Sequence, residues 1–364
     1  MWIEVSGVRN LAEQRISFGT GLNLLTGANG QGKTSVLESI YLLGTTRSYR
    51  TSRLSELVGT GKLAARVAGE GDSPGNRLAV RIAARERSYL RHGTAVTASE
   101  YLGALDVVAL SSELVQRFRE KPMERRRFLD RMALATWPGY LDDLRNFRRA
   151  NAQRAALAAS GGQGAQREAW DARTSALALP VARRRVEMAA ALERQLREAP
   201  ERIFPEGRGV RVKLISRPAL ESAETEAGQR YCAQLAEAFS RQPALAGRRE
   251  TPAGPGRDDL AVEVEGRNLL RYGSSGQVRS LLAAATLGEM TRLKGMKGAF
   301  PALVLDDVES DLDEDRYGAL LAALGGGAQV FAATSRSRLA HPMLRSDDPA
   351  ARRFLVKDGV VAAA

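Results

Sequence analysis

GANGQGKT, residues 27–34, decides the fold of this 364-residue chain. The stretch fits G-x-x-x-x-G-K-[ST], the spacing of a phosphate-binding loop that joins a strand to a helix. An apolar run at residues 21–25 precedes it and predicts a short strand. Apolar residues then recur at helical spacing from Val36 to Leu43, and a glycine follows. Because strand, loop and helix come in the required order, the sequence predicts an α/β domain that binds a nucleotide.

The residue types of this loop suit ATP held with magnesium. Glycines let backbone N–H groups converge on phosphate oxygens, and the following helix points its partial positive charge at the same anion. Lys33 should reach the β- and γ-phosphates, and the Thr34 hydroxyl should bind Mg²⁺. We therefore predict that the following residues bind the nucleotide: Gly27, Ala28, Asn29, Gly30, Gln31, Gly32, Lys33, Thr34 and Ser35.

A second stretch, Pro301 to Asp307, is an apolar strand that ends in two acids. Asp306 is predicted to lie beside the loop and to hold the Mg²⁺ shell. The adjacent Asp307 faces differently and could orient or deprotonate the attacking water. Strands that end in Asp also begin ordinary turns, so the signal depends on its pairing with the loop. The predicted catalytic residues are Lys33 and Asp307, and the predicted metal ligands are Thr34 and Asp306.

Residues 273–277 (GSSGQ) form a polar turn before an apolar helical stretch, 278–287. A Ser/Gly turn at a helix N-terminus is a site for an anion. Since the chain already has one phosphate cradle, this turn would serve a nucleotide that a second molecule holds. Ser274, Gly276 and Gln277 are the predicted contacts. An ordinary flexible turn is the alternative interpretation.

A helical block separates two parts with strand-like patterns. Helical stretches at 140–159 and 167–196 are joined by a Gly/Gln loop, so they predict an antiparallel arm, with a kink at Pro180. A Pro/Gly/Arg-rich linker covers 241–257. The predicted fold is a split α/β domain with mixed sheets and an inserted helical arm. The predicted domains are 1–112 and 251–364 for the two α/β parts and 113–250 for the arm; strands are expected near 64–67, 78–83, 107–110, 302–305, 329–333 and 354–361.

Composition adds a partner class. The net charge is +12, and only seven of the 54 basic residues are lysine. Arginine suits phosphate contacts, and a field of this sign favours nucleic acid. A GC-rich genome could explain arginine in place of lysine, but it does not explain the net excess. No apolar run of membrane-spanning length and no secretion signal are found, and a single Cys232 excludes a disulfide framework, so we expect a cytoplasmic protein with no membrane partner.

In this order the three elements resemble those of ABC-type ATPases, in which a Ser-Gly-x-Gly-Gln-like signature caps the neighbour's ATP in a head-to-tail dimer. Over essentially the whole chain the sequence is similar to the RecF family of bacterial recombination proteins. The stretches that carry the similarity are Arg9-Asn10, 27–43, Thr46 to Arg50, Arg125 to Asp130, Arg257 to Leu260, 273–277 and LVLDDVESDLD at 303–313.

This resemblance implies a protein that binds DNA in an ATP-dependent manner and dimerises around two ATP molecules. It implies slow, DNA-stimulated hydrolysis and help in loading recombinase at gaps, with a RecR-type partner. Double-stranded DNA and gap junctions are the expected substrates, with single-stranded DNA as a further candidate. Four sites depart from the family pattern, which usually has Pro at Ala28, Gln at Ser275, His at Gly256 and Pro-Glu-Asp where Ser112-Glu113 stand. These departures are expected to affect the rate of ATP hydrolysis and the strength of the dimer more than ATP binding.

Three functional readings follow. The first is an ATP-gated DNA clamp, and the second is an ATP-dependent assembly scaffold with negligible turnover. The third, a transporter ATPase, is disfavoured by the basic charge, by the arginine-rich arm and by Thr334-Ser335 where transporters have His. The Arg125–Arg127 run is either a phosphate grip or a solvated helix face, and Arg47 and Arg50 face either nucleotide or DNA.

Overall fold

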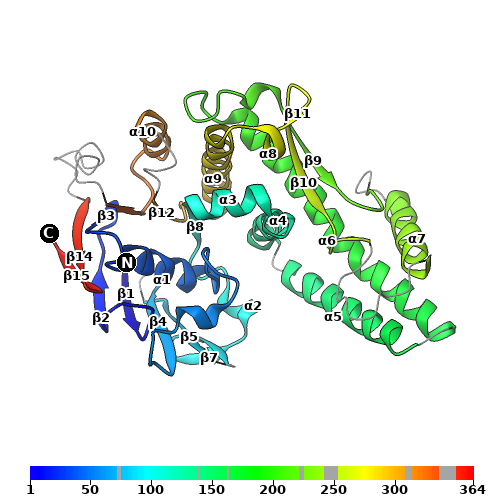
Figure 1. Ribbon diagram of the computed structural model, residues 1–364, viewed down its shortest axis with the longest axis horizontal. Helices are drawn as coiled ribbons and strands as arrows, with labels where there is room; N and C mark the ends of the chain where they lie inside the picture. Colours follow the sequence, from blue (N-terminus) through cyan, green and yellow to red (C-terminus); the bar gives the residue numbers. More distant parts are fainter. Residues whose placement is uncertain are drawn as a thin grey trace. The chain divides into compact units, whose positions relative to one another are not determined.

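The computed structural model describes residues 1–71, 75–84, 86–137, 139–161, 164–220, 225–241, 253–307, 314–335 and 350–364. The chain forms two compact units, which are drawn in Figure 1. Unit 1 comprises 1–117, 199–207 and 274–364, and unit 2 comprises 118–198 and 208–273. Residues 162–163, 242–252 and 308–313, on which parts of the predicted loop, linker and final motif fall, lie outside the described residues. The domain limits predicted from the sequence stay a prediction.

A mostly parallel sheet carries the phosphate-binding loop. Its strand order is β15-β14-β3-β13-β12-β8. All neighbours are parallel except the β14–β15 pair. The strands are β3 (Leu22–Thr26), β8 (Val107–Ser111), β12 (Ala302–Asp306), β13 (Val330–Thr334), β14 (Arg352–Lys357) and β15 (Val360–Ala363). Because parallel strands end at the same edge, the loop after β3 and the acids at the end of β12 meet there.

Helix α1 (Lys33–Thr45) has apolar residues on every side because two sheets cover it. It contacts β8, β12 and β13 of the parallel sheet and also β4 and β5 of a second, antiparallel sheet. A helix covered on two sides needs apolar residues all round. Val36, Leu37, Ile40 and Leu43 are accordingly 0% exposed. Two further helices belong to this unit, α9 (Ser275–Lys297) and α10 (Glu314–Ala323).

The antiparallel sheet has the order β2-β1-β4-β5-β6-β7. Alternation puts Ile3 and Val5 of β1 into the core, while Glu4 between them lies on the opposite face. The short helical segments η1 (Leu54–Leu57) and α2 (Ala98–Tyr101) precede β4 and follow β7. The strands are β1 (Trp2–Ser6), β2 (Gln14–Ser17), β4 (Ala64–Glu70), β5 (Arg77–Ala83), β6 (Arg87–Arg91) and β7 (Thr94–Val96).

The predicted terminal strand at 354–361 is wrong in one respect, because the structure forms a hairpin there. Strands β14 and β15 pair antiparallel, with Lys357 opposite Val360. The two residues between them, Asp358 and Gly359, have φ angles of 50° and 78°. Asp-Gly with positive φ at both positions is the turn that joins two strands tightly. The Asp-Gly pair at 358–359 is therefore the feature of the sequence that indicates a hairpin.

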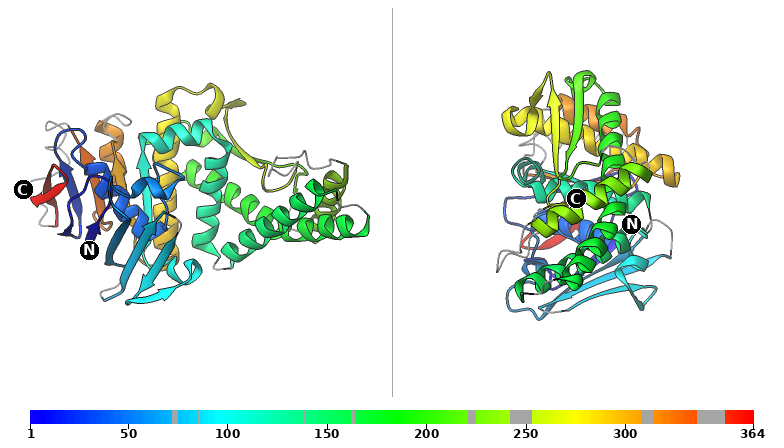
Figure 2. Two further views of the ribbon diagram at one scale, coloured as in Figure 1. Left: turned by 60° about the horizontal axis from the view of Figure 1, so that its bottom comes forward. Right: turned by 90° about the vertical axis from the view of Figure 1, so that its right-hand side faces the viewer.

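Unit 2 is mainly helical and contains the predicted arm. Helix α6 (Ala165–Glu198) runs through Pro180 as one element and packs against α5 (Tyr140–Ala159) and α7 (Thr225–Arg241); Figure 2 shows α5 and α6 along one another. Helix α4 (Pro122–Thr136) begins at Pro122, since proline suits the first helical turn. The remaining elements are α3 (Ser112–Glu120), whose last residues belong to this unit, and η2 (Gly207–Gly209), β9 (Val210–Ile215), β10 (Asp259–Val264), β11 (Arg267–Asn268) and α8 (Leu269–Tyr272).

A buried ion network holds unit 2 together. Arg185 on α6 is 2% exposed. Its guanidinium donates to Asp130 on α4 at 2.9 and 3.2 Å and to Asp258 at 2.9 Å. Tyr140 on α5 also donates to Asp130, at 2.6 Å. The network thus joins three helices to the chain before β10.

The three-arginine run on α4 is committed to contacts within unit 2. Arg125 is 6% exposed and donates to both carboxylate oxygens of Asp259, at 2.5 and 3.0 Å. Arg126 donates to the Asp258 carbonyl, and Arg127 pairs with Glu124. For Arg125, neither a solvated helix face nor a phosphate grip describes what is observed, because its fork is already filled. Among the described residues of the whole chain, no helix is long and apolar enough to cross a bilayer.

Candidate nucleotide-binding site

The loop at 27–34 has the backbone that glycine alone allows easily. Gly27, Gly30 and Gly32 have φ angles of 141°, 81° and 111°. A Cβ on Gly27 would lie 2.3 Å from the Val356 carbonyl oxygen, and one on Gly32 would lie 2.9 Å from Leu11. A side chain is disfavoured by conformation at all three positions and is excluded by the backbone of Val356 at Gly27, whereas a Cβ on Gly30 would meet nothing within 4 Å. Ala28, Asn29 and Gly30, at the outer part of the loop, are exposed.

Lys33 folds back over the loop. Its Nζ donates to the Gly27 carbonyl at 2.7 Å and to the Ala28 carbonyl at 2.9 Å, and the residue is 8% exposed. A positive charge is thereby held inside the curve of the loop, beside the N-terminus of α1. Both features attract an anion at the same place.

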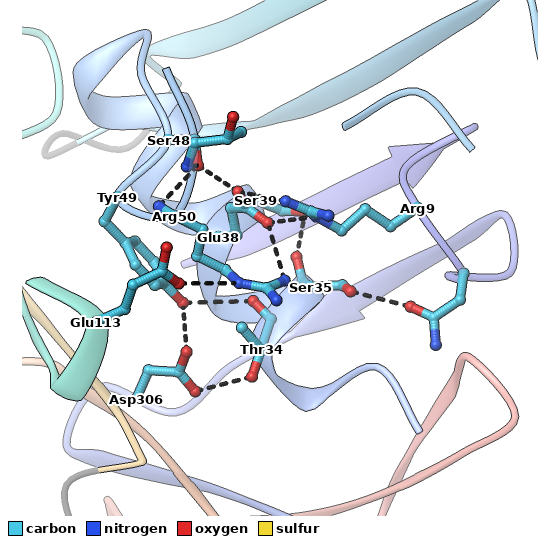
Figure 3. Close-up of polar contacts among 12 residues, drawn as sticks. Arg9, Thr34, Ser35, Glu38, Ser39, Ser48, Tyr49, Arg50, Glu113 and Asp306 are labelled. Carbon is cyan, nitrogen blue, oxygen red and sulfur yellow. Dashed lines mark hydrogen bonds and ion pairs between the residues drawn. The ribbon is translucent and has the colours of Figure 1, made fainter. Parts of the chain in front are cut away.

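The end of β12 meets the start of α1 across 272 residues of sequence. The Thr34 hydroxyl donates to Asp306 Oδ1 at 3.0 Å. The Tyr49 hydroxyl donates to the other oxygen, Oδ2, also at 3.0 Å (Figure 3). Burial raises the pKa of the Asp306 carboxyl, and the hydrogen bonds from Tyr49 and Thr34 act against that rise. Burial also raises the pKa of Tyr49 well above its ordinary value, so the phenol remains a donor.

The oxygen atoms of Thr34 and Asp306 could serve as ligands of a magnesium ion. A hydroxyl and a carboxylate are the hard oxygen ligands that Mg²⁺ prefers, and the remaining ligands are usually water and phosphate oxygens. Thr34 and Asp306 are close enough to share one ion. Asp307, next in the chain, is exposed and has a φ of 53°, so its side chain leaves the strand in another direction. The different directions of the two side chains are consistent with the different roles predicted for the two acids.

A buried carboxylate on α1, Glu38, was not predicted. It is 0% exposed and accepts from Arg9 at 2.5 and 3.0 Å. The Ser48 hydroxyl donates to the same group, and Arg50 lies 3.7 Å from it. Glu38 thus fixes the loop after β1 and the segment after α1 to the helix that begins the site (Figure 3). Arg50 turns toward Glu38 and toward Glu113, which is also 3.7 Å away. In the sequence, Glu38 could have been noticed as an acidic residue within an apolar helical run.

Asn10 attaches the loop after β1 to the phosphate-binding loop. Its Nδ2 donates to the Gly30 carbonyl at 2.9 Å, and its Oδ1 accepts from the Ser35 hydroxyl at 2.9 Å. Ser35, a predicted nucleotide contact, therefore uses its hydroxyl on Asn10. The Arg9-Asn10 pair was noted in the sequence for its resemblance only, and the contacts give both residues a structural role.

The turn before α9 forms a capping box. Ser274 Oγ accepts from the Gln277 N–H at 3.1 Å, and Gln277 Oε1 accepts from the Ser274 N–H at 2.9 Å. Gln277 also donates to Glu206 at 3.0 Å. The turn is thus rigid, and Ser274 is exposed at the start of a 23-residue helix. This favours an ordered anion site over a flexible turn, while the predicted roles of Ser274, Gly276 and Gln277 stay predictions.

Fold and site together define a P-loop ATPase head of the SMC kind. The RecF/RecN/SMC N terminal domain model matches residues 1–348. A solved Smc head domain from Pyrococcus furiosus has a similar fold, with a TM-score of 0.52 and 18% identity over 100% of this chain and 95% of that one. The mixed sheets and the helical insert expected from the sequence are confirmed.

The chain belongs to the RecF family. It is 35% identical to the DNA replication and repair protein RecF of Anaeromyxobacter sp. strain Fw109-5, over 95% of this chain and 94% of that protein. The RecF of Limosilactobacillus fermentum is 31% identical over 94% and 95%. A solved structure of the recombination mediator RecF with ATP, described as part of the RecFOR pathway, has a TM-score of 0.85 and 26% identity and covers 100% of this chain and 96% of that one.

Proposed function

We propose that this protein is an ATP-dependent DNA-binding protein of recombinational repair and replication-gap processing. The observation that carries the proposal is the contact of Thr34 with Asp306 beside a glycine-shaped loop. It brings together residues from the two predicted halves of the nucleotide site, which are 272 residues apart in the sequence. The family membership and the solved RecF–ATP relative support ATP as the nucleotide.

In the proposed site, backbone N–H groups of residues 27–34 hold the phosphates and Lys33 neutralises charge on the β- and γ-phosphates. Thr34 and Asp306 hold Mg²⁺, which when bound supplies positive charge against the charge that develops on the transferred phosphoryl group. Asp307 orients or deprotonates the attacking water. Because Asp306 is buried and Asp307 exposed, the two acids are suited to different tasks.

We propose further that two copies close around two ATP molecules in a head-to-tail dimer. Ser274, Gly276 and Gln277 of one copy would contact the γ-phosphate held by the other. The capping box supports this, because it presents the Ser274 end of α9 as an ordered, exposed N-terminus. Hydrolysis would remove the bridging phosphate and open the dimer.

DNA is the proposed partner of the closed dimer, with a RecR-type mediator as protein partner. The net charge of +12 supports a polyanionic substrate. Such binding should weaken steeply with salt because counterions are released from the DNA. Opening after hydrolysis would then release the DNA, and the chemistry would act as a timer.

The experiment that tests this proposal compares wild type with Lys33→Arg. DNA affinity and sedimentation are measured with ATP, with ADP and without nucleotide. The expected result for wild type is a heavier species and tighter DNA binding with ATP alone. Identical mass and identical DNA affinity in all three states would refute the clamp.

An ATP-dependent assembly scaffold with negligible turnover is the second candidate. It is separated from the first by Asp307→Ala. Loss of hydrolysis with retained ATP-dependent dimerisation supports the enzyme. A wild-type protein that releases no phosphate with DNA present supports the scaffold.

A further inference from the structure

Asp306 is held by two hydroxyl groups, and only one of them has a proposed role with the metal. Thr34 donates to Oδ1 and Tyr49 to Oδ2, each at 3.0 Å. Thr34 is a proposed Mg²⁺ ligand in its own right. The Tyr49 hydroxyl also donates to the Thr34 carbonyl, at 3.4 Å, so its shorter hydrogen bond is the one that holds the carboxylate.

Tyr49 is itself fixed on several sides. It is 2% exposed, and its ring meets Tyr41 edge to face with centroids 5.4 Å apart. Its carbonyl accepts from Arg117 at 3.0 Å. Its chain neighbours Ser48 and Arg50 are both held at Glu38. A side chain locked by packing and by hydrogen bonds can keep a neighbouring ligand in one orientation.

We propose that Tyr49 is a positioning residue that presents the Asp306 carboxylate to Mg²⁺ and so couples the metal to ATP affinity. The inference rests on the proposed nucleotide site and adds a residue to it. A carboxylate that has lost one of its donors can rotate about its side-chain bonds. It then has to be reordered when the metal binds, and that cost appears as weaker metal affinity.

The competing reading is that Tyr49 is a core aromatic residue whose hydroxyl is merely satisfied. Under that reading Tyr49→Phe lowers stability but leaves the response to Mg²⁺ unchanged. Tyr101 offers a matched control in the same unit. It is 1% exposed, and its hydroxyl donates to the Leu43 carbonyl of α1 at 2.7 Å, at the opposite end of that helix from Thr34.

The test measures the affinity of a fluorescent ATP analogue for wild type, Tyr49→Phe and Tyr101→Phe while Mg²⁺ is titrated, and repeats it in EDTA. We expect Tyr49→Phe to raise the Mg²⁺ concentration for half-effect about tenfold, the size that a hydrogen bond to a charged group supports. In EDTA its affinity should equal that of wild type. Tyr101→Phe should follow wild type in both conditions.

A second measurement covers a variant that folds less stably. The rise in thermal midpoint that ATP produces is recorded with Mg²⁺ and with EDTA, which requires only folded protein at the start of the melt. A Tyr49→Phe protein whose Mg²⁺ response matches that of Tyr101→Phe overturns the positioning role. A wild type that binds no ATP analogue at all overturns the proposed nucleotide site instead, so the two failures are distinguishable.

Discussion

The backbone N–H of Asp358 donates to the side-chain oxygen of Gln31 at 2.5 Å, although 327 residues separate them in sequence. The next residue, Gly359, donates its N–H to the Gln31 carbonyl at 3.0 Å. Gly359 also accepts from Ala12 and from Gln14. The turn of the terminal hairpin thus sits between the phosphate-binding loop and the loop after β1, and supports both.

This relationship predicts that Gly359→Ala weakens ATP binding without touching the nucleotide. A Cβ at this position would lie 2.1 Å from the Asn10 carbonyl oxygen, so the turn must move away from the loops it supports. Because the loop is then displaced, we expect about a tenfold loss of ATP affinity, which is equivalent to about 1.4 kcal/mol of binding free energy. Fluorescence titration with an ATP analogue measures it.

Gly93→Ala is the control for the backbone strain. Gly93 also has positive φ, 83°, and lies in a turn of unit 1, but a Cβ there would meet nothing within 4 Å. It should therefore cost stability alone, about 1 kcal/mol. Equal ATP affinity of Gly359→Ala and Gly93→Ala would show that the hairpin does not support the loop.

Glu38 should be among the most sensitive positions of unit 1. Glu38→Gln leaves the Arg9 guanidinium without its charged partner in a mostly buried place, and breaking such a pair costs about 3 kcal/mol. The exposed pair of Glu4 and Arg66 has a comparable distance, 2.7 Å, with both side chains nearly half exposed. Glu4→Gln should therefore cost less than about 1 kcal/mol. Thermal midpoints of the two variants give the comparison, and similar losses would contradict the importance of burial.

The parts of the candidate site that could be predicted from the sequence are those in which chemistry restricts the residue types. The glycines of the loop, Thr34 and Asp306 follow from spacing and from strand ends, and the structure brings Thr34 and Asp306 together. The parts it could not predict depend on contacts between distant segments. Nothing in the pattern around Tyr49 indicates that its hydroxyl reaches an acid 257 residues further on. Arg125 likewise lies in a run of three arginines that is typical of an exposed helix face, and its burial depends on its pairing with Asp259, 134 residues further on.

In unit 2 we expect Arg185→Ala to loosen the junction of α4 and α6. The change leaves Asp130 and Asp258 without their shared cation in a buried place, which costs about 3–5 kcal/mol. Hydrogen exchange followed by mass spectrometry should show lost protection in both helices. Arg241→Ala, which removes an exposed pair with Glu237, is the control and should leave exchange unchanged. Unchanged protection in Arg185→Ala would mean that packing alone holds the junction.

The buried Asp306 carboxyl should make the stability of the nucleotide-free protein depend on pH in a defined direction. Burial raises the pKa of Asp306 above the ordinary 3.8. Between pH 3.8 and the folded-state pKa, the folded protein therefore keeps a proton that the unfolded chain has lost. Its contribution to stability is complete below pH 3.8 and is lost as the pH rises through the folded-state pKa. Asp306→Asn carries a neutral group of the same shape at every pH. The stability of wild type relative to Asp306→Asn should therefore fall as the pH is raised from 4.

Thermal midpoints of both proteins in EDTA, taken at intervals from about pH 4 to pH 8, measure this difference across the range in which carboxyl groups titrate. Adding ATP and Mg²⁺ should raise the stability of wild type relative to Asp306→Asn at the upper end of this range, because the ion favours the charged carboxylate that only wild type has. A difference that rises with pH in EDTA would mean that the hydroxyls of Thr34 and Tyr49 outweigh burial. A difference that ATP and Mg²⁺ leave unchanged would remove Asp306 from the metal site.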